Sequence, residues 1–224
     1  MKKKLILLLV LSLVLAACGA PAVETTAPAA ETTAPAVETT APAVETTVPV
    51  TEAPTEAVQL PLTADSMEFS FLSGAGAWST NLSLNRDGSF AGVFHDSEMG
   101  EMGDDYPNGT VYICAFSGAF TEIQQISEYA YSMKLAEIRT EHQEGEEWIE
   151  DGIRYVASGP HGLNDSTEFV LYLPDTPVDQ LSEGFLIWWP YFFEQETNPR
   201  DTLDCFGILN VGMEFGFFGL GEGR

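Results

Sequence analysis

The sequence predicts an all-β globular domain, an antiparallel barrel or sandwich of about eight strands with at most short helices. Segments 67–72 and 78–84 alternate apolar and polar residues with the period of two that is typical of a half-buried strand. Asp87 and Gly88 follow the second segment, and an Asp-Gly pair favours the tight turn of a β-hairpin. Later apolar segments are also short and are joined largely by connections of hairpin length.

Further strands are expected in order along the domain. Residues 89–94 return from the hairpin turn, and the later candidates are 110–120, 129–135, 152–157, 168–173, 204–211 and 214–219. Gly118 and Gly207 lie inside such segments and indicate bulges or barrel corners. One short helix is expected after Pro177, over residues 178–183. The charged stretch 137–147 is expected to be a loop or a frayed helical turn.

The start of the second predicted strand carries a recognisable motif. Gly76, Ala77 and Trp78 open this strand, and a glycine-containing hairpin follows it. The arrangement resembles the opening of lipocalin-like barrels, in which the tryptophan plugs the barrel floor. The resemblance implies a closed barrel with an internal pocket and makes Trp78 a candidate ligand-binding residue.

The first 17 residues have the layout of a secretory signal peptide. Three lysines precede an apolar run over residues 5–15, which is too short to span a bilayer. Residues 15–18, Leu-Ala-Ala-Cys, resemble the lipobox of bacterial lipoproteins, which implies that Cys18 receives a diacylglyceryl group and becomes the N-terminus. Two acyl chains suffice for stable anchoring. We therefore expect attachment through Cys18 to the extracytoplasmic face of the cell membrane; the alternative is ordinary cleavage that leaves Cys18 a thiol.

Residues 18–58 are predicted to be a disordered linker. A seven-residue unit rich in Thr, Pro and Glu recurs from Val23, and proline recurs in it at positions that exclude a coiled coil. Polyproline-like or random coil remains, and the repeated glutamates favour extension. The globular domain is thus expected over residues 59–224, at the end of a spacer.

The charge of the chain limits its partners. Without the signal peptide, 6 basic residues stand against 34 acidic ones. Such a surface cannot neutralise many phosphates, so nucleic acid is excluded as a partner. Anionic lipid headgroups would also repel it, so membrane contact is expected through the lipid on Cys18 alone.

Two cysteines remain in the globular domain. Cys114 and Cys205 could form a disulfide, because an extracytoplasmic location permits one. Both also lie in apolar segments, and free cysteine is among the residue types most often buried. The sequence leaves these two alternatives open.

An acidic loop is a candidate metal site. Five carboxylates lie between two strand segments, with two glycines among them, and calcium prefers six to eight oxygen ligands. The spacing does not match an EF-hand loop, and acidic surface loops are expected in so acidic a protein. Calcium binding is therefore an alternative that would use Asp96, Glu98, Glu101, Asp104 and Asp105.

The densest aromatic run, over residues 185–193, is a candidate binding surface. Trp188, Trp189 and Tyr191 could stack on a sugar or contact an apolar surface of a partner. An unbroken apolar run is more often core, although Pro190 interrupts this one and indicates a corner near the surface.

Residues 67–219 resemble a group of uncharacterised lipoproteins of Gram-positive bacteria on segments 73–80, 95–97 and 106–110. The resemblance implies an envelope location and supplies no catalytic residue. Because no nucleophile elbow, zinc helix or phosphate loop is present either, we expect no enzyme and no cofactor. The predicted function is a lipid-anchored binding module for a small apolar or glycan-like ligand or for another envelope protein. The alternative is a cell-wall glycan hydrolase that uses a carboxylate pair.

Overall fold

A computed structural model describes residues 58–74 and 76–219. The predicted signal peptide, the linker to residue 57 and the lipidation site at Cys18 lie outside these ranges. Within them, no helix has both the length and the apolar character that crossing a membrane requires.

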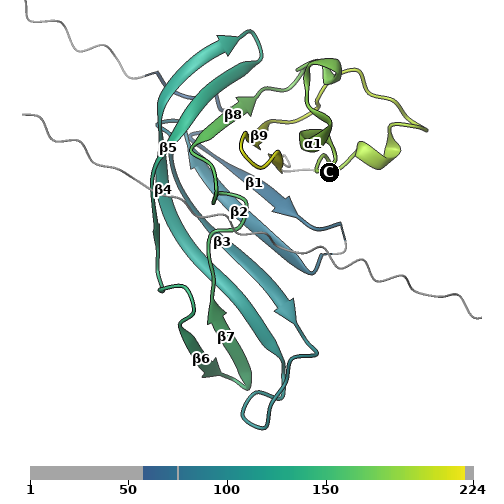
Figure 1. The fold of residues 1–224 in the computed structure, drawn as a ribbon. Coiled ribbons are helices and arrows are strands. Elements are labelled where there is room, and N and C mark those ends of the chain that lie inside the picture. The colour runs from purple at the N-terminus through teal and green to yellow at the C-terminus, as the bar shows by residue number, and fades with distance from the viewer. Residues whose placement is uncertain (1–57, 75, 220–224) are drawn as a thin grey trace, which may run out of the picture. The chain divides into compact units, whose positions relative to one another are not determined.

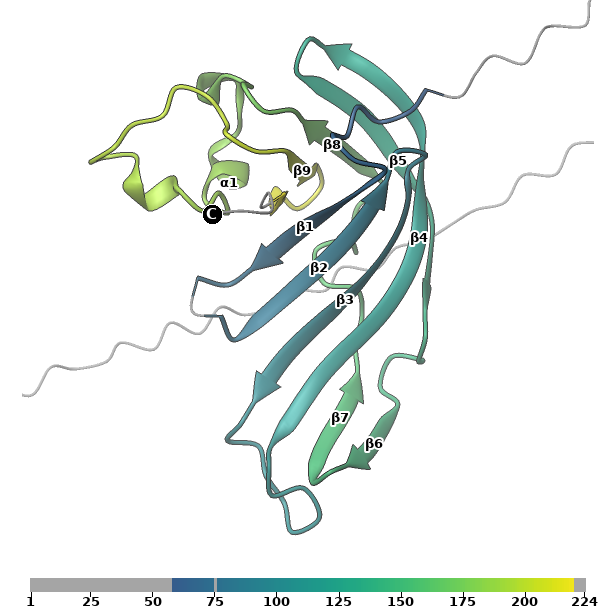
Figure 2. The same cartoon turned by 180° about the vertical axis from the view of Figure 1, so that it is seen from behind.

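The described residues form one continuous sheet in which eight strands close an antiparallel barrel (Figures 1 and 2), which confirms the predicted fold class. Going round the barrel, the strand order is β3-β2-β1-β10-β9-β8-β5-β4, and β4 pairs with β3 to close the ring. The barrel strands are β1 (Ser66–Leu72), β2 (Trp78–Asn85), β3 (Ser89–Glu98), β4 (Thr110–Ser127), β5 (Ala130–Thr140), β8 (Glu168–Tyr172), β9 (Gly207–Asn210) and β10 (Phe215–Phe218).

The predicted hairpin between β2 and β3 is confirmed, and its residues show why it forms. Gly88 has φ +87°, and a Cβ there would lie 2.5 Å from the Phe120 carbonyl oxygen, so only glycine fits. The Asp87 carboxylate accepts hydrogen bonds from the hydroxyl and backbone N–H of Ser89 at 2.6 and 2.9 Å. These hydrogen bonds, that from the hydroxyl first, lower the pKa of Asp87.

A second hairpin, β6 (Glu147–Glu150) and β7 (Ile153–Ala157), extends the sheet beyond the barrel. The first part of β4 pairs with β7 in parallel, and its later part pairs with β5. The expectation for residues 137–147 was therefore wrong at both ends, since residues 137–140 continue β5 and Glu147 begins β6, whereas residues 141–146 between them do form a loop. Most side chains here are exposed or only half-buried, so no alternation of apolar residues marks these strands in the sequence.

The barrel interior is filled with side chains rather than hollow. Inward-facing residues of every barrel strand form one buried cluster, dominated by phenylalanines such as Phe69, Phe71, Phe120, Phe169 and Phe217. Gly118, where the sequence indicated a bulge or barrel corner, lies in a crowded place. A Cβ on Gly118 would lie 2.5 Å from the Phe90 ring and 2.4 Å from the Glu137 carbonyl oxygen. Gly118 thus allows β3, β4 and β5 to pack closely around this cluster.

A second apolar layer covers the outside of β8, β9 and β10. It is built by the segment between β8 and β9, which contains three short helices: η1 (Val178–Gln180), α1 (Glu183–Leu186) and η2 (Phe192–Glu194). The expected helix over 178–183 is thus split, and α1 begins after Ser182, whose hydroxyl accepts a hydrogen bond from the Phe185 N–H. We call residues 174–206 the outer segment; both views place α1 on the outer side of β8 and β9 (Figures 1 and 2).

Candidate functional site

An apolar groove lies where the outer segment meets the barrel wall. It encloses about 560 Å³, and its lining comes from the end of β1, from the outer segment and from β10. Within residues 58–74 and 76–219, no charged side chain lines the groove, and the lining residues are Ser70, Leu72, Gly74, Ile187, Trp188, Trp189, Pro190, Phe193 and Phe218. A volume of this size suits a small ligand.

The alternation of β1 and β10 explains how the groove wall arises. Phe69 and Phe71 point into the barrel, so the residues between and after them, Ser70 and Leu72, face outward. In β10, Phe217 belongs to the interior cluster, whereas Phe218 packs with the outer segment. The barrel therefore supplies one wall of the groove and the outer segment supplies the other.

The groove carries apolar side chains that are exposed to solvent. Leu72 is 43% exposed, Ile187 is 44% exposed and Phe193 is 87% exposed. Contiguous exposed apolar surface is typical of a binding site, whereas isolated exposed apolar residues are ordinary. Sequence reasoning missed Leu72, because an outward Leu at a strand end carries no signal of its own. Ile187 and Phe193 lie in the predicted run 185–193 but were not singled out within it.

The structure separates the four aromatic residues that were predicted to bind a ligand. Trp188 and Trp189 line the groove, although Trp189 is only 2% exposed and serves mainly as a packed wall. Tyr191 does not line the groove, and the Arg200 guanidinium lies 3.7 Å from the centre of its ring. Trp78 does not line it either.

Trp78 belongs instead to an aromatic cluster with His161. Its ring centroid lies 4.9 Å from Phe71, 5.0 Å from His161 and 6.1 Å from Trp188. Burial lowers the pKa of His161, and the nearby Asp96 carboxylate partly offsets this effect. The loop that carries His161 is tied to β2 by a 2.8 Å hydrogen bond from the Thr80 hydroxyl to the His161 carbonyl.

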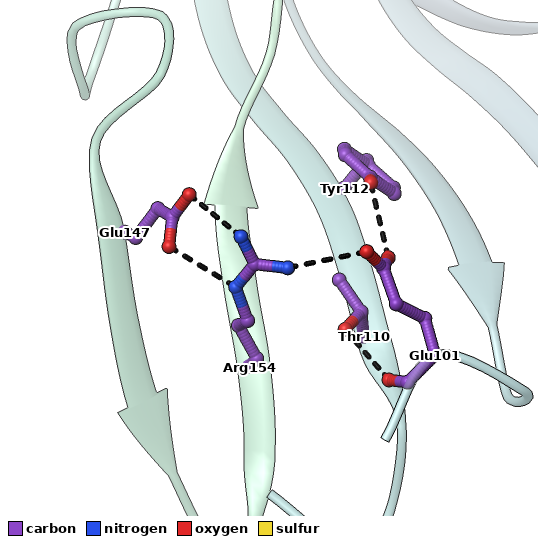
Figure 3. A network of polar contacts seen from close by, with 5 residues as sticks. All are labelled: Glu101, Thr110, Tyr112, Glu147 and Arg154. Atoms are coloured by element: carbon purple, nitrogen blue, oxygen red, sulfur yellow. Dashed lines mark hydrogen bonds and ion pairs between the residues drawn. The ribbon is translucent and has the colours of Figure 1, made fainter. Parts of the chain in front are cut away.

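Within the acidic loop, Glu101 is held by a network of polar contacts with residues of β4 and β7 (Figure 3). Arg154 donates two hydrogen bonds to Glu147, at 3.0 and 2.7 Å, and one of 3.3 Å to the Glu101 carboxylate. Tyr112 donates to the same carboxylate at 3.1 Å, and the Thr110 hydroxyl donates to the Glu101 carbonyl at 2.9 Å. The hydrogen bonds from Arg154 lower the pKa of Glu147, and the hydrogen bond to Glu101 raises that of Tyr112.

This network bears on the calcium alternative. No three His, Cys, Asp or Glu side chains among the described residues are grouped so that they could hold a metal ion. The structure thus does not bring together the five carboxylates named for calcium, which are Asp96, Glu98, Glu101, Asp104 and Asp105. Glu101 fastens the loop to β4 and β7 instead.

The two cysteines lie in different clusters. Cys114 is a buried free thiol that packs in the barrel interior, and Cys205 packs with the outer segment. No disulfide therefore joins Cys114 to Cys205. Burial raises the pKa of the Cys114 thiol to about 11, and the Glu144 carboxylate adds to the effect.

A more polar depression of about 460 Å³ on the outside of β5 and β8 contains two carboxylates, Glu122 and Glu168. Glu122 forms a 2.8 Å ion pair with Lys134, which lines the same depression. A glycosidase needs two carboxylates that face each other across a groove. This depression holds a carboxylate that is already in a salt bridge, so we take the apolar groove as the candidate site.

Comparisons with known proteins add no further assignment. No protein-family model, no curated protein and no solved structure matches the chain.

Proposed function

We propose that this protein is a lipid-anchored binding module on the extracytoplasmic face of the cell membrane, and that the groove binds an apolar ligand. The observation that carries the proposal is the groove itself, with its uncharged lining and its exposed Leu72, Ile187 and Phe193. The lipobox at residues 15–18 and the repeat-rich linker support the anchor and the display of the domain away from the membrane.

The groove, and not the barrel interior, is the binding site in this proposal. A lipocalin-like pocket would require a hollow barrel, whereas phenylalanines and leucines fill the interior here. Side chains buried this completely pack about as densely as an organic crystal, so the described core residues occupy the space that a lipocalin-like ligand would need. The outer groove is already open and apolar, so a ligand can enter it without a change in the core.

Substitution of exposed groove residues tests the binding site without threatening the fold. Ile187→Ser and Phe193→Ser would be made in the full chain carrying Cys18→Ala, which removes the lipid. Binding of decyl maltoside, followed by tryptophan fluorescence and calorimetry below its critical micelle concentration, should weaken about tenfold or more in the double variant. Ile126→Ser is the matched control, because Ile126 is 57% exposed on β4 and is not a lining residue. Equal weakening by the control, or no binding by the parent chain, would contradict the proposal.

The anchor has its own test. The wild-type chain should sediment with membranes and carry a diacylglyceryl group on Cys18 in mass spectrometry of the mature N-terminus. Cys18→Ala should release it from the membrane fraction. A mature N-terminus without a diacylglyceryl group, or a chain whose signal peptide is removed equally in the presence of globomycin, would refute the lipid anchor and leave the groove proposal standing.

Contact with another envelope protein is the second candidate function. Phe193 favours it, because an aromatic ring that is 87% exposed is a suitable anchor for a protein interface. A photo-crosslinking amino acid at position 193 should then capture one specific membrane-associated partner in cells. Crosslinks that are lost with the Ile187→Ser change would assign that partner to the groove.

A further inference from the structure

The described residues leave no basic side chain unpaired. They contain five basic residues against 27 acidic ones, and each basic residue forms an ion pair within 4 Å. The pairs are Arg86–Asp65, Lys134–Glu122, Arg139–Glu137, Arg154 with Glu101 and Glu147, and Arg200–Asp204. The unpaired charges on this surface are therefore carboxylates.

In the part of the chain that the structure describes, the groove lining offers no cation that would hold an anionic headgroup. These lining residues include no Lys, Arg or His, and their polar side-chain groups are the Ser70 hydroxyl and the indole N–H groups of Trp188 and Trp189. Exposed carboxylates follow one of its walls directly, since Glu194 and Glu196 come just after Phe193 in the outer segment. A carboxylate or phosphate placed beside Phe193 would lie near this acidic stretch and would meet a surface of net negative charge.

Aromatic rings of the outer segment are suited to a cation. Arg200 already lies over the Tyr191 ring at 3.7 Å, which is well inside the range of a cation–π contact. The Phe193 ring, 87% exposed, presents a similar face to solvent at the groove. An apolar ligand that carries a positive charge could thus bury its body in the groove and place its cation against Phe193 and the Glu194 carboxylate.

We propose that the groove selects cationic amphiphiles, molecules with an apolar body and an ammonium or guanidinium group, over neutral and anionic ones. This inference rests on the proposed function, because it assigns the ligand class of the same groove. A second copy of the chain is a poor occupant, since the net charge of −22 given by the described residues opposes self-association. Fatty acids and anionic phospholipids are excluded by the same field.

Three probes with one alkyl chain separate the headgroup from the apolar body. Decyltrimethylammonium, decyl maltoside and decanoate would be titrated into the full Cys18→Ala chain below their critical micelle concentrations. At 20 mM salt the dissociation constant of the cationic probe should be about tenfold or more below that of decanoate, with decyl maltoside between them. At 500 mM salt the difference should shrink to about twofold, because the screening length falls to a few ångströms.

Charge-neutralising variants distinguish the groove rim from the overall charge. Glu194→Gln with Glu196→Gln should lower the preference for the cationic probe about threefold or more and leave decyl maltoside binding unchanged. Glu128→Gln with Glu150→Gln removes two exposed carboxylates from the β4–β5 turn and from β6, and should change the preference less than 1.5-fold.

The outcomes separate the two proposals. If none of the probes binds, the proposed function fails. If all three bind with equal affinity, or decanoate binds best, the groove stands and the charge selectivity is refuted. Equal effects of the two variant pairs would refute the role of the rim.

Discussion

Replacing Phe185 by alanine should destabilise the protein strongly, whereas replacing Phe193 by alanine should leave its stability unchanged. Both phenylalanines lie in the outer segment, eight positions apart. Phe185 is fully buried, and its ring centroid lies 4.8 Å from Phe218 and 5.3 Å from Tyr172. Phe193 is 87% exposed. The comparison therefore tests which part of the aromatic run is core.

The magnitude follows from what surrounds the Phe185 ring. A Cβ on Gly207 would lie 2.7 Å from this ring, and a Cβ on Gly216 would lie 3.0 Å from it, so the ring rests on the bare backbone of β9 and β10. Little can move in to fill the space that alanine would leave. We expect a loss of about 3–5 kcal/mol in the free energy of unfolding, a large fraction of the 5–15 kcal/mol typical of a domain. Phe193→Ala should change it by less than about 0.5 kcal/mol.

Urea denaturation of the Cys18→Ala chain measures both effects. Tryptophan fluorescence reports the surroundings of all four tryptophans, of which Trp188 and Trp189 lie in the outer segment, and far-ultraviolet circular dichroism reports the sheet. The Phe185→Ala midpoint should fall in both signals. A loss below about 1 kcal/mol for Phe185→Ala, or a loss above it for Phe193→Ala, would refute the assignment of the two faces.

Three further predictions concern buried polar and titratable groups. The pKa of His161 is lowered in the folded state, so the free energy of unfolding should fall as pH drops from about 6.5 through the folded pKa. In His161→Gln, the urea midpoint should depend less on pH over that range. The Cys114 thiol, with a pKa of about 11 and a buried position, should react with a disulfide reagent at pH 8 only in urea; fast reaction in native buffer would contradict its placement. Asn210→Ala should cost about 2 kcal/mol or more, because the buried Asn210 amide donates to the Gly162 and Asn164 carbonyls; a change below 0.5 kcal/mol in urea unfolding would contradict this network.

The sequence was sufficient to predict the strands whose two faces differ. Every predicted strand exists, because residues such as Phe69 and Leu82 alternate with polar neighbours and bury one face. The sequence was not sufficient to predict β6, or the C-terminal parts of β4 and β5 beyond residues 120 and 135, because side chains on both faces are largely exposed there. Barrel and sandwich also could not be separated, since the choice depends on long-range pairing of β3 with β4 and of β1 with β10.

The candidate site was predicted only in part, for a physical reason. The aromatic run was identified, but which of its rings are exposed depends on the packing of α1 against β9 and β10. Phe185 and Trp189 became core, while Ile187 and Phe193 stayed exposed. Leu72 and Ser70, the other wall, lie more than a hundred residues away in the sequence, and no local pattern joins them to the run.

The groove lies beside the weakest join of the barrel. Among the described residues, β1 and β10 share one register pair, Ser70↔Phe218, whereas the other neighbouring barrel strands share four or more. Both residues of that pair line the groove. A bound ligand would contact β1, β10 and the outer segment at once, and would therefore hold this join together.

This coupling gives a measurement that is independent of affinity. Hydrogen exchange of the backbone amides in β1 and β10 should slow when decyltrimethylammonium saturates the groove, because exchange there requires opening of the β1–β10 join. Amides in β6 and β7, at the far end of the sheet, should exchange as before (Figure 1). Protection that spreads equally over β6 and β7 would indicate general stabilisation, and protection confined to those strands would place the ligand elsewhere. Only slower exchange at the join fits a ligand that bridges the barrel wall and the outer segment.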